Sequence, residues 1–309
     1  MKSKTIVFPS KLQAEIVERD IMPLQKDEIL AKTIVNGICM WEIHCFNHVD
    51  NPSLQPGHEG ISVVVDVGEN VSNIKPGDYV TSLEWSEYTV QKATNVIKLE
   101  STPQDAGLYM LEPLACAINA VAHTNLYPSD KVLLSGCGYM GFLLLKLISG
   151  YPLSNITVCD FKEENLELAK QFGANSVINA NDIAKVSALS SDSFQVTYEC
   201  SGAASSLELC NRLTARGGTV GLYAWHHGTR TVDTDGWHDK GLRILNLSPG
   251  ITANERRFRS FQASSSLTCS GKFSQEGLIT HRYKIDDAQR ALEESTVRGT
   301  GFIKSIFEF

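Results

Sequence analysis

Three glycines that follow an apolar run are the residues whose spacing most clearly predicts chemistry. They lie directly after residues 131–135, which have the character of a strand, and they open a segment with a helical pattern. In that context the first glycine makes a tight turn, the second lets backbone approach a pyrophosphate, and the third lets helix and strand pack closely. The helix N-terminus offers N–H groups and a partial positive charge to phosphates. The residues assigned to this predicted dinucleotide site are Gly136, Gly138, Tyr139, Met140 and Gly141.

An acidic residue further along indicates which dinucleotide binds. Asp160 ends the next apolar run, at about the 20-residue spacing where such sites hold a ribose-binding carboxylate. A carboxylate there accepts hydrogen bonds from the adenosine ribose and repels a 2′-phosphate, which favours NAD over NADP. The alternative is that Asp160 caps the helix predicted over residues 162–172.

A second set of residues has the chemistry of a metal site. Cys39 precedes a short apolar stretch, His58 and Glu59 lie in a Pro-Gly-His-Glu-Gly turn, and Glu112 precedes a proline. Zinc binds thiolate, imidazole and carboxylate ligands, and a catalytic zinc keeps one position open. Cys39 and His58 with either carboxylate would make such a set. From spacing alone, a core cysteine, a solvated turn and a helix start remain open alternatives for these residues.

The segments that must position these residues change character near residue 120. Before it, short β-like runs alternate with turns, which predicts a small, mostly antiparallel domain. These runs are residues 28–35, 61–67, 88–90 and 96–99.

After residue 120, strands alternate with helices, which predicts a parallel sheet covered on both faces. The strands are predicted at 131–135, 156–159, 176–178, 195–200, 219–223 and 242–247, and the helices at 139–148, 163–172 and 203–213. We expect the closing elements to return to the first domain, so that the second domain is inserted within it. Those elements are a strand at 278–283, a helix at 286–297 and a strand at 302–307.

Composition limits the class of protein. The chain has 309 residues, 42% hydrophobic residues and a net charge of −7, which suits a two-domain globular protein and excludes a disordered chain. The acidic balance argues against nucleic-acid or anionic-membrane partners, and no apolar run is long enough for a membrane span or a signal peptide. The 8 cysteines include no C-x-x-C pair, which favours reduced thiols in a cytoplasmic protein.

In order along the chain, these residues resemble the zinc-containing medium-chain dehydrogenase/reductases, the group of alcohol, polyol and threonine dehydrogenases. The Gly-Ile-Cys…His pattern resembles the family's first-ligand segment, and Pro-Gly-His-Glu-Gly resembles its signature turn. Glu-Pro-Leu-Ala resembles the polyol and threonine branch in particular. The matching segments are residues 37–44, 56–60, 64–68, 77–80, 112–115, 172–174, 199–202, 217–218 and 279–282.

The resemblance implies an α/β protein with a GroES-like catalytic domain (1–118 and 267–309), an inserted Rossmann domain (119–266) and an active site between them. It implies NAD(H), one catalytic zinc and a small-molecule substrate, namely a secondary alcohol of a polyol, cyclitol, amino alcohol or sugar-like molecule, or the matching ketone. It makes Cys39 and His58 zinc ligands, Glu112 the third ligand or the anchor of a metal-bound water, and Glu59 a neighbouring or exchanging ligand.

The resemblance also assigns supporting roles. His44 matches the outer histidine of the family's proton relay. Ser201 would border the adenine pocket, and Leu222 would end the strand whose backbone passes the nicotinamide. By analogy with the family, we expect a homodimer or homotetramer.

The chain departs from the family pattern in two places. Trp41 stands where the family usually has a serine or threonine that passes on the substrate proton, and an indole cannot relay a proton as a hydroxyl does. Trp41 would line the pocket and stack on a flat substrate, or merely fill space. The loop with four cysteines that often holds a structural zinc is absent, since no cysteine lies between Cys45 and Cys116. We therefore expect one catalytic zinc and no structural zinc.

Two further readings stay open because of the missing hydroxyl. One is a reductase of carbonyl, imine or enoyl groups that works without the usual relay. The other is a non-catalytic nucleotide-binding protein, since a fold alone does not secure an activity.

Overall fold

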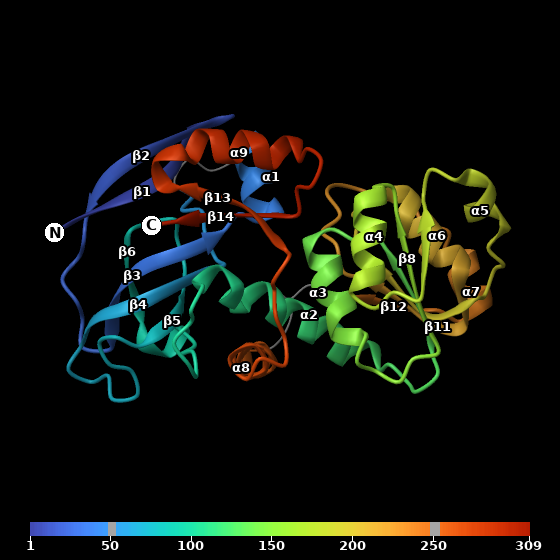
Figure 1. Cartoon of the computed structure of the whole chain (residues 1–309), viewed down its shortest axis with the longest axis horizontal. Coiled ribbons are helices and arrows are strands. Elements are labelled where there is room, and N and C mark those ends of the chain that lie inside the picture. The colour runs from blue at the N-terminus through green and yellow to red at the C-terminus, as the bar shows by residue number, and fades with distance from the viewer. Residues whose placement is uncertain (49–53, 248–253) are drawn as a thin grey trace. The chain divides into compact units, whose positions relative to one another are not determined.

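The structure is a computed structural model that describes residues 1–48, 54–247 and 254–309. The chain forms two compact units (Figure 1). Met1–Leu114 and Phe261–Phe309 form one, the β-rich unit, and Ala115–Ser260 form the other, the parallel-sheet unit. Both boundaries between the units lie a few residues before the expected ones at 118/119 and 266/267. They fall inside helices α2 (Leu111–Thr124) and α8 (Asn254–Cys269).

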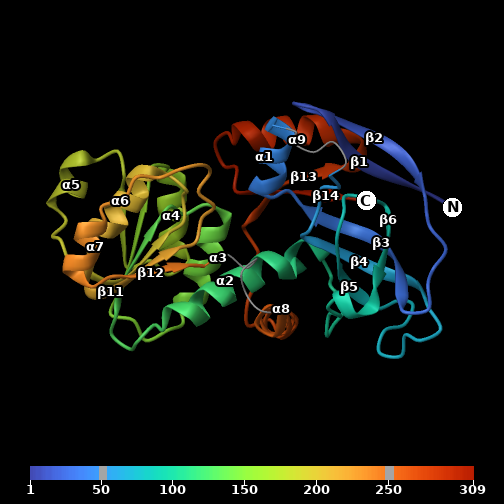
Figure 2. The ribbon, with the colours of Figure 1, turned by 180° about the vertical axis from the view of Figure 1, so that it is seen from behind.

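A mostly antiparallel sheet forms the centre of the β-rich unit. Its strands are ordered β13-β14-β3-β4-β5, with β6 also paired to β3. Strands β13 and β14 run parallel to each other, and the other pairs are antiparallel. Strands β1 and β2 form a separate hairpin, and Figures 1 and 2 both show α9 beside it. The bounds are β1 Lys2–Ser10, β2 Gln13–Asp20, β3 Glu28–Gly37, α1 Met40–His48, β4 Gly60–Val67, β5 Tyr79–Ser82, β6 Tyr88–Lys92, β13 Ile279–Lys284, α9 Ala288–Val297 and β14 Lys304–Glu308.

A buried tryptophan fixes the end of β3, where the metal-site residues begin. Trp85 is completely buried, and its ring meets Phe8 and Phe307 edge-on at centroid distances of 6.0 and 5.0 Å. Its Nε1 donates a hydrogen bond to the Gly37 carbonyl at 3.1 Å. Helix α1 starts three residues later and buries its Ile43 and Phe46 side chains in the same cluster. Packing of the core therefore sets the position of Cys39, between β3 and α1.

A six-stranded parallel sheet forms the other unit. Its order is β12-β11-β10-β7-β8-β9, so the chain moves outward from β7 in both directions. Ligands of such doubly wound sheets bind beyond the carboxyl ends of the strands at this reversal point. The bounds are β7 Lys131–Ser135, α3 Tyr139–Ile148, β8 Asn155–Asp160, α4 Glu163–Gln171, β9 Ser176–Asn179, α5 Ile183–Ala188, β10 Phe194–Glu199, α6 Ala204–Leu213, β11 Thr214–Leu222, α7 Thr234–Lys240 and β12 Arg243–Asn246.

The two sheets confirm the expected α/β class, with a mostly antiparallel unit and a doubly wound parallel sheet. No helix within the described ranges is both long and apolar enough to cross a membrane.

One predicted strand is wrong. Residues 96–99 follow a single 3-10 turn, Ala93–Asn95, and form one isolated bridge, between Lys98 and Val80, instead of a strand. The backbone N–H of Ile97 is bound by the Thr81 hydroxyl at 2.9 Å, which replaces a ladder bond to a carbonyl. The last helix also begins two residues later than predicted, after the 3-10 turn Ile285–Asp287.

Candidate metal centre and nucleotide pocket

Three predicted metal-site residues converge in the β-rich unit. One ligand atom each from Cys39, His58 and Glu59 lies within 4.8 Å of the others, and in the described part of the chain this is the one such group of three or more. Cys39 lies between β3 and α1, and the other two residues lie just before β4. The fold therefore joins residues that lie far apart in the sequence into one candidate site.

Glu42, which the sequence analysis did not single out, orients the histidine. Its side chain is fully buried in the first turn of α1. Oε1 lies 2.6 Å from His58 Nδ1 and accepts from the Gly57 N–H at 3.0 Å, while Oε2 accepts from the Cys39 N–H at 3.1 Å. Because a carboxylate can only accept, the ring proton lies on Nδ1, which leaves Nε2 as the nitrogen that can bind a metal.

A buried ion pair holds Glu59. Its Oε2 pairs with the ammonium group of Lys304 on β14, and both side chains are almost fully buried. The same ammonium donates to the Ile38 carbonyl at 3.0 Å. A Cβ built on Gly37 would lie 1.9 Å from Glu59 Oε2, so only glycine leaves room for this carboxylate. Glu59 therefore lies near the other two candidate ligands, while its negative charge is paired with the Lys304 ammonium group.

The donor types fit a zinc ion. Thiolate, imidazole and carboxylate are the ligands that zinc takes in proteins. Burial raises the pKa of the Cys39 thiol, and the Glu59 charge adds to this effect. Burial lowers the pKa of His58, but the Glu42 charge and the hydrogen bonds with Cys39 and Glu42 outweigh it, so the net shift is upward. A cation bound at this site would displace these protons, as metal binding to thiol and imidazole requires.

The other predicted residues of the β-rich unit, Glu112, Trp41 and His44, lie outside this set of three. The Glu112 carboxylate is not part of the set of three, although its charge contributes to the raised pKa of His58. The half-buried Trp41 ring meets the His58 ring at a centroid distance of 5.9 Å and an angle of 83°. His44 stacks on His48 on the next turn of α1, with centroids 4.2 Å apart. The Trp41 indole thus lies beside the His58 imidazole in an edge-to-face arrangement.

The glycine turn of the parallel-sheet unit has the shape that a phosphate site needs. Gly136 has φ +96°, and a Cβ there would lie 2.8 Å from the Ser201 Cβ. A Cβ on Gly138 would meet open space, and one on Gly141 would lie 2.7 Å from the Gly136 carbonyl. Gly138 occupies the N-cap position of α3 and has no side chain with which to cap the helix. The turn therefore presents its backbone to a ligand at the helix end, where Tyr139 and Met140 begin the first turn.

Asp160 fastens this turn to the next strand. Its Oδ2 accepts from the Cys137 N–H at 2.6 Å, and its Oδ1 accepts from the Lys162 N–H at 2.9 Å. Lys162, not Asp160, occupies the N-cap position of α4. Oδ1 also accepts from the Asn165 side-chain amide at 3.3 Å, whereas Oδ2 accepts one such bond, so Oδ2 keeps acceptor capacity for the predicted contact with a ribose hydroxyl.

A pocket of about 640 Å³ opens beside Asp160. Its volume is in the range of small-molecule and cofactor sites. Ser201, predicted to border an adenine pocket, lies in its wall. Leu222 is not among its lining residues, and its side chain packs against the buried cluster of Leu207, Cys210 and Val220. Phe161 and Ile183 expose apolar surface at this pocket, as a flat heterocycle would require.

Sequence reasoning missed Glu42 and Lys304. Glu42 had a local signal, since a carboxylate three residues after Cys39 in a first helical turn can accept the Cys39 N–H. Lys304 had none, because it lies 245 residues from Glu59 and only the pairing of β14 with β3 brings the two together.

Two protein-family models match the chain. The model described as zinc-binding dehydrogenase matches residues 136–260, and the model described as alcohol dehydrogenase GroES-like domain matches residues 25–109. Together they match more than half of the chain.

Curated relatives match over nearly full length. An uncharacterised zinc-type alcohol dehydrogenase-like protein of Escherichia coli is 24% identical over 100% of this chain and 99% of its own. An L-threonine 3-dehydrogenase of Pyrococcus horikoshii is 28% identical over 93% of each chain. A D-xylulose reductase of Saccharomyces cerevisiae is 26% identical over 91% of this chain and 90% of its own.

Solved structures share the fold. An Escherichia coli oxidoreductase/dehydrogenase of unknown specificity has a TM-score of 0.89 at 22% identity, and covers 100% of this chain and 99% of its own. Galactitol-1-phosphate dehydrogenase from Escherichia coli has a TM-score of 0.85 at 19% identity, and covers 99% of this chain and 100% of its own. At these identities the likeness concerns the fold alone.

Proposed function

Because the chain belongs to the zinc-containing medium-chain dehydrogenases, we propose that it is a zinc- and NAD(H)-dependent alcohol dehydrogenase. Its substrate is a secondary alcohol of a polyol, cyclitol, amino alcohol or sugar-like molecule, or the matching ketone in the reverse direction. The relatives named as threonine dehydrogenase and xylulose reductase support this substrate class. The observation that carries the proposal is the convergence of Cys39, His58 and Glu59 within 4.8 Å, with Glu42 orienting the imidazole.

The residues around the candidate metal centre have separate tasks in this proposal. Cys39 and His58 hold the metal, and a zinc ion bound there would polarise the substrate oxygen as a Lewis acid. Glu42 keeps Nε2 of His58 turned toward the metal. Trp41 supplies a flat apolar surface beside His58, on which a sugar-like or cyclitol ring can lie.

The two candidate third carboxylates differ in a way that can be tested. Glu59 is close to the metal-binding set, but Lys304 competes for its charge. Glu112 lies outside the set but acts electrostatically on His58. If one of these carboxylates binds the metal, its replacement by glutamine should lower the zinc content of the protein. If the other acts as a proton acceptor, its replacement should leave the zinc content unchanged and alter the pH–rate profile.

The proposed cofactor use rests on the glycine turn and on Asp160. The backbone at Gly138 and the N-terminus of α3 would bind the pyrophosphate, and the pocket beside Asp160 would take the adenosine half. A carboxylate at this position favours a free ribose hydroxyl over a 2′-phosphate, which is the basis for proposing NAD. A homodimer or homotetramer remains a prediction, which light scattering would test.

Metal analysis and a substrate panel test the proposal together. Purified protein should contain about one zinc per chain, and Cys39→Ala and His58→Ala should lose it, whereas Cys269→Ala, a half-buried cysteine outside the set, should keep it. Polyols, amino alcohols and cyclitols would be screened with NAD, read by NADH absorbance. A zinc-free protein that turns these substrates over would refute the metal assignment.

The reductase reading is favoured by one observation, the Trp41 indole beside His58, where a relay hydroxyl is usual. A chain that reduces carbonyl, imine or enoyl compounds with NADH, but oxidises no alcohol of the panel, would select this reading. Binding of NADH without turnover of any compound would favour the non-catalytic one.

A further inference from the structure

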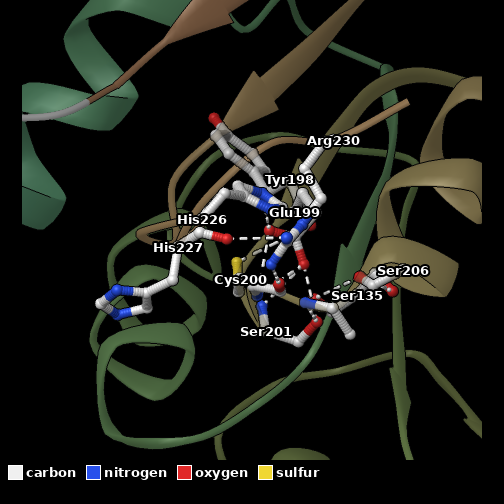
Figure 3. A network of polar contacts seen from close by, with 11 residues as sticks. Ser135, Tyr198, Glu199, Cys200, Ser201, Ser206, His226, His227 and Arg230 are labelled. Atoms are coloured by element: carbon white, nitrogen blue, oxygen red, sulfur yellow. Dashed lines mark hydrogen bonds and ion pairs between the residues drawn. The ribbon is translucent and has the colours of Figure 1, made fainter. Parts of the chain in front are cut away.

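A buried carboxylate, Glu199, fixes the turn that follows β10 (Figure 3). Its Oε1 accepts from the backbone N–H of Ser201 at 2.9 Å, from the Ser201 hydroxyl at 2.7 Å and from the Gly202 N–H at 3.0 Å. Hydrogen bonds to an ionised acceptor are stronger than neutral ones. The conformation of the Ser201–Gly202 turn therefore depends on this one side chain.

The same carboxylate holds the loop that follows β11, residues 223–230. Oε2 lies 2.7 Å from Nε2 of His226, whose side chain is 13% exposed. The ring N–H is not aimed along this line, so the contact is an electrostatic one. The Glu199 carbonyl accepts from the N–H groups of Tyr223 and Ala224 at 2.9 Å each, and Arg230 donates to the Gly202 carbonyl at 3.2 Å. Side-chain and backbone contacts thus bind this loop, called the β11 loop below, to the turn after β10.

The turn after β10 is in turn packed against the glycine turn. A Cβ on Gly136 would lie 2.8 Å from the Ser201 Cβ, and the Cys200 N–H donates to the Ser135 carbonyl at 2.8 Å. A chain of contacts therefore runs from the β11 loop through Glu199 and Ser201 to the predicted phosphate site. All of these residues belong to the parallel-sheet unit.

A charge buried in this way has to be explained. Burying a carboxylate against an imidazole costs desolvation that offsets much of their attraction, so this contact contributes little net stability. Glu199 and His226 belong neither to the glycine turn nor to the metal-binding set, and the hydrogen bonds that Glu199 accepts from Ser201 and Gly202 do not require a histidine at position 226. What the pair does provide is a fixed geometry of two loops that follow neighbouring strands.

A dinucleotide on a doubly wound sheet spans the point where the strand order reverses. If the adenosine half lies beside Asp160 at the end of β8, the other half extends over the carboxyl ends of β10 and β11. We propose that the Glu199–His226 pair is a positioning device for the cofactor: it holds the β11 loop as the wall against which the nicotinamide half binds. This role rests on the proposed use of a nicotinamide dinucleotide.

Comparing the binding of the complete cofactor, NADH, with the binding of its adenosine half, AMP, separates this role from a merely structural one. We would measure the dissociation constants of NADH and of AMP for the full-length, metal-containing protein. In His226→Leu, the dissociation constant for NADH should rise about tenfold or more, the range expected for loss of a charge-assisted contact, while that for AMP should change less than about twofold. In Glu199→Gln both should rise, because Ser201 borders the adenosine pocket as well.

The control is His238→Leu, since His238 is exposed on α7, outside the network, and this variant should bind both ligands like the wild type. If His226→Leu does not fold, His226→Gln replaces it and should show the same selective loss for NADH. Equal weakening of NADH and AMP in the His226 variant, or no weakening of either, would overturn the positioning role. A wild-type protein that binds AMP but no nicotinamide dinucleotide would instead refute the proposed function.

Discussion

Replacing Glu42 by glutamine tests whether an outer carboxylate controls the metal centre. All three groups that face this side chain are donors, namely the Cys39 N–H, the Gly57 N–H and His58 Nδ1. A carboxylate satisfies all three with two acceptor oxygens. A glutamine has one acceptor oxygen, and its NH₂ group would point at a donor.

The magnitude follows from these contacts. Removing the carboxylate partner of a metal-binding histidine typically costs about 10–100-fold in metal affinity, which corresponds to about 1.4–2.8 kcal/mol. The amide also leaves a buried N–H donor without an acceptor, which costs about 1–3 kcal/mol of folding stability because Glu42 is fully buried. Glu42→Gln should therefore bind zinc more weakly and melt at a lower temperature.

The assay is competition for zinc between the protein and a chromophoric chelator, combined with thermal unfolding of the metal-free and metal-bound forms. Glu18→Gln is the matched control, because Glu18 is an exposed partner of Lys2 and such pairs contribute little. Glu42→Asp keeps both acceptor oxygens and should lose less affinity than the glutamine variant. Zinc affinity of Glu42→Gln within about twofold of the wild type would refute the reasoning, since the orienting contact is expected to be worth at least about tenfold.

Three further predictions concern other parts of the chain. Asp160→Ala should weaken NAD binding and reduce the preference over NADP, measured by titration of both; unchanged NAD binding would contradict the ribose assignment. Trp41→Ser should alter the pH dependence of kcat/KM by restoring a relay hydroxyl, and an identical profile would show that this position takes no part in proton transfer. Burial raises the pKa of Asp78, but hydrogen bonds from Lys98 and from the Lys75 N–H outweigh it, so the pKa lies below its ordinary value. The ionised Asp78 therefore stabilises the fold above the unfolded-state pKa, and this stabilisation is lost as the pH falls through the pKa of the folded state. Asp78→Asn should lower the melting temperature at pH 7 but not near pH 2. An equal fall in melting temperature at both pH values would refute this.

Local signals accounted for the glycine turn. Gly136, Gly138 and Gly141 lie within one strand–turn–helix unit, so their spacing could be read from the sequence, and the structure shows the positive φ of Gly136 and the close approach of Gly141 to the Gly136 carbonyl. The closeness of Gly136 to Ser201 could not be read in this way, because Ser201 lies outside that unit. The types of the metal-site residues were also readable, because few side chains bind zinc. Their assembly was not, since Glu42 meets His58 across 16 residues and Lys304 meets Glu59 across 245.

Helix α8 shows why some helices cannot be predicted from the pattern of apolar residues in the sequence. Its sequence is polar and rich in serine, and its few apolar residues form no continuous stripe along the helix. The buried side consists partly of hydroxyl groups: Ser264 is fully buried and donates to the Leu111 carbonyl at 2.9 Å. A helix that packs through hydrogen-bonded serines cannot be recognised from hydrophobic periodicity.

The ion pair between Glu59 and Lys304 also sets an order of events during synthesis. A ribosome adds about 5–20 residues per second, so the 245 residues between the two partners take roughly 12–49 seconds to make. During that interval Cys39, His58 and Glu59 already exist, whereas the lysine that neutralises the carboxylate does not. A metal ion that met the growing chain once β3 and β4 had paired would therefore find Cys39, His58 and Glu59 without competition from Lys304, because the ammonium arrives only when β14 pairs with β3.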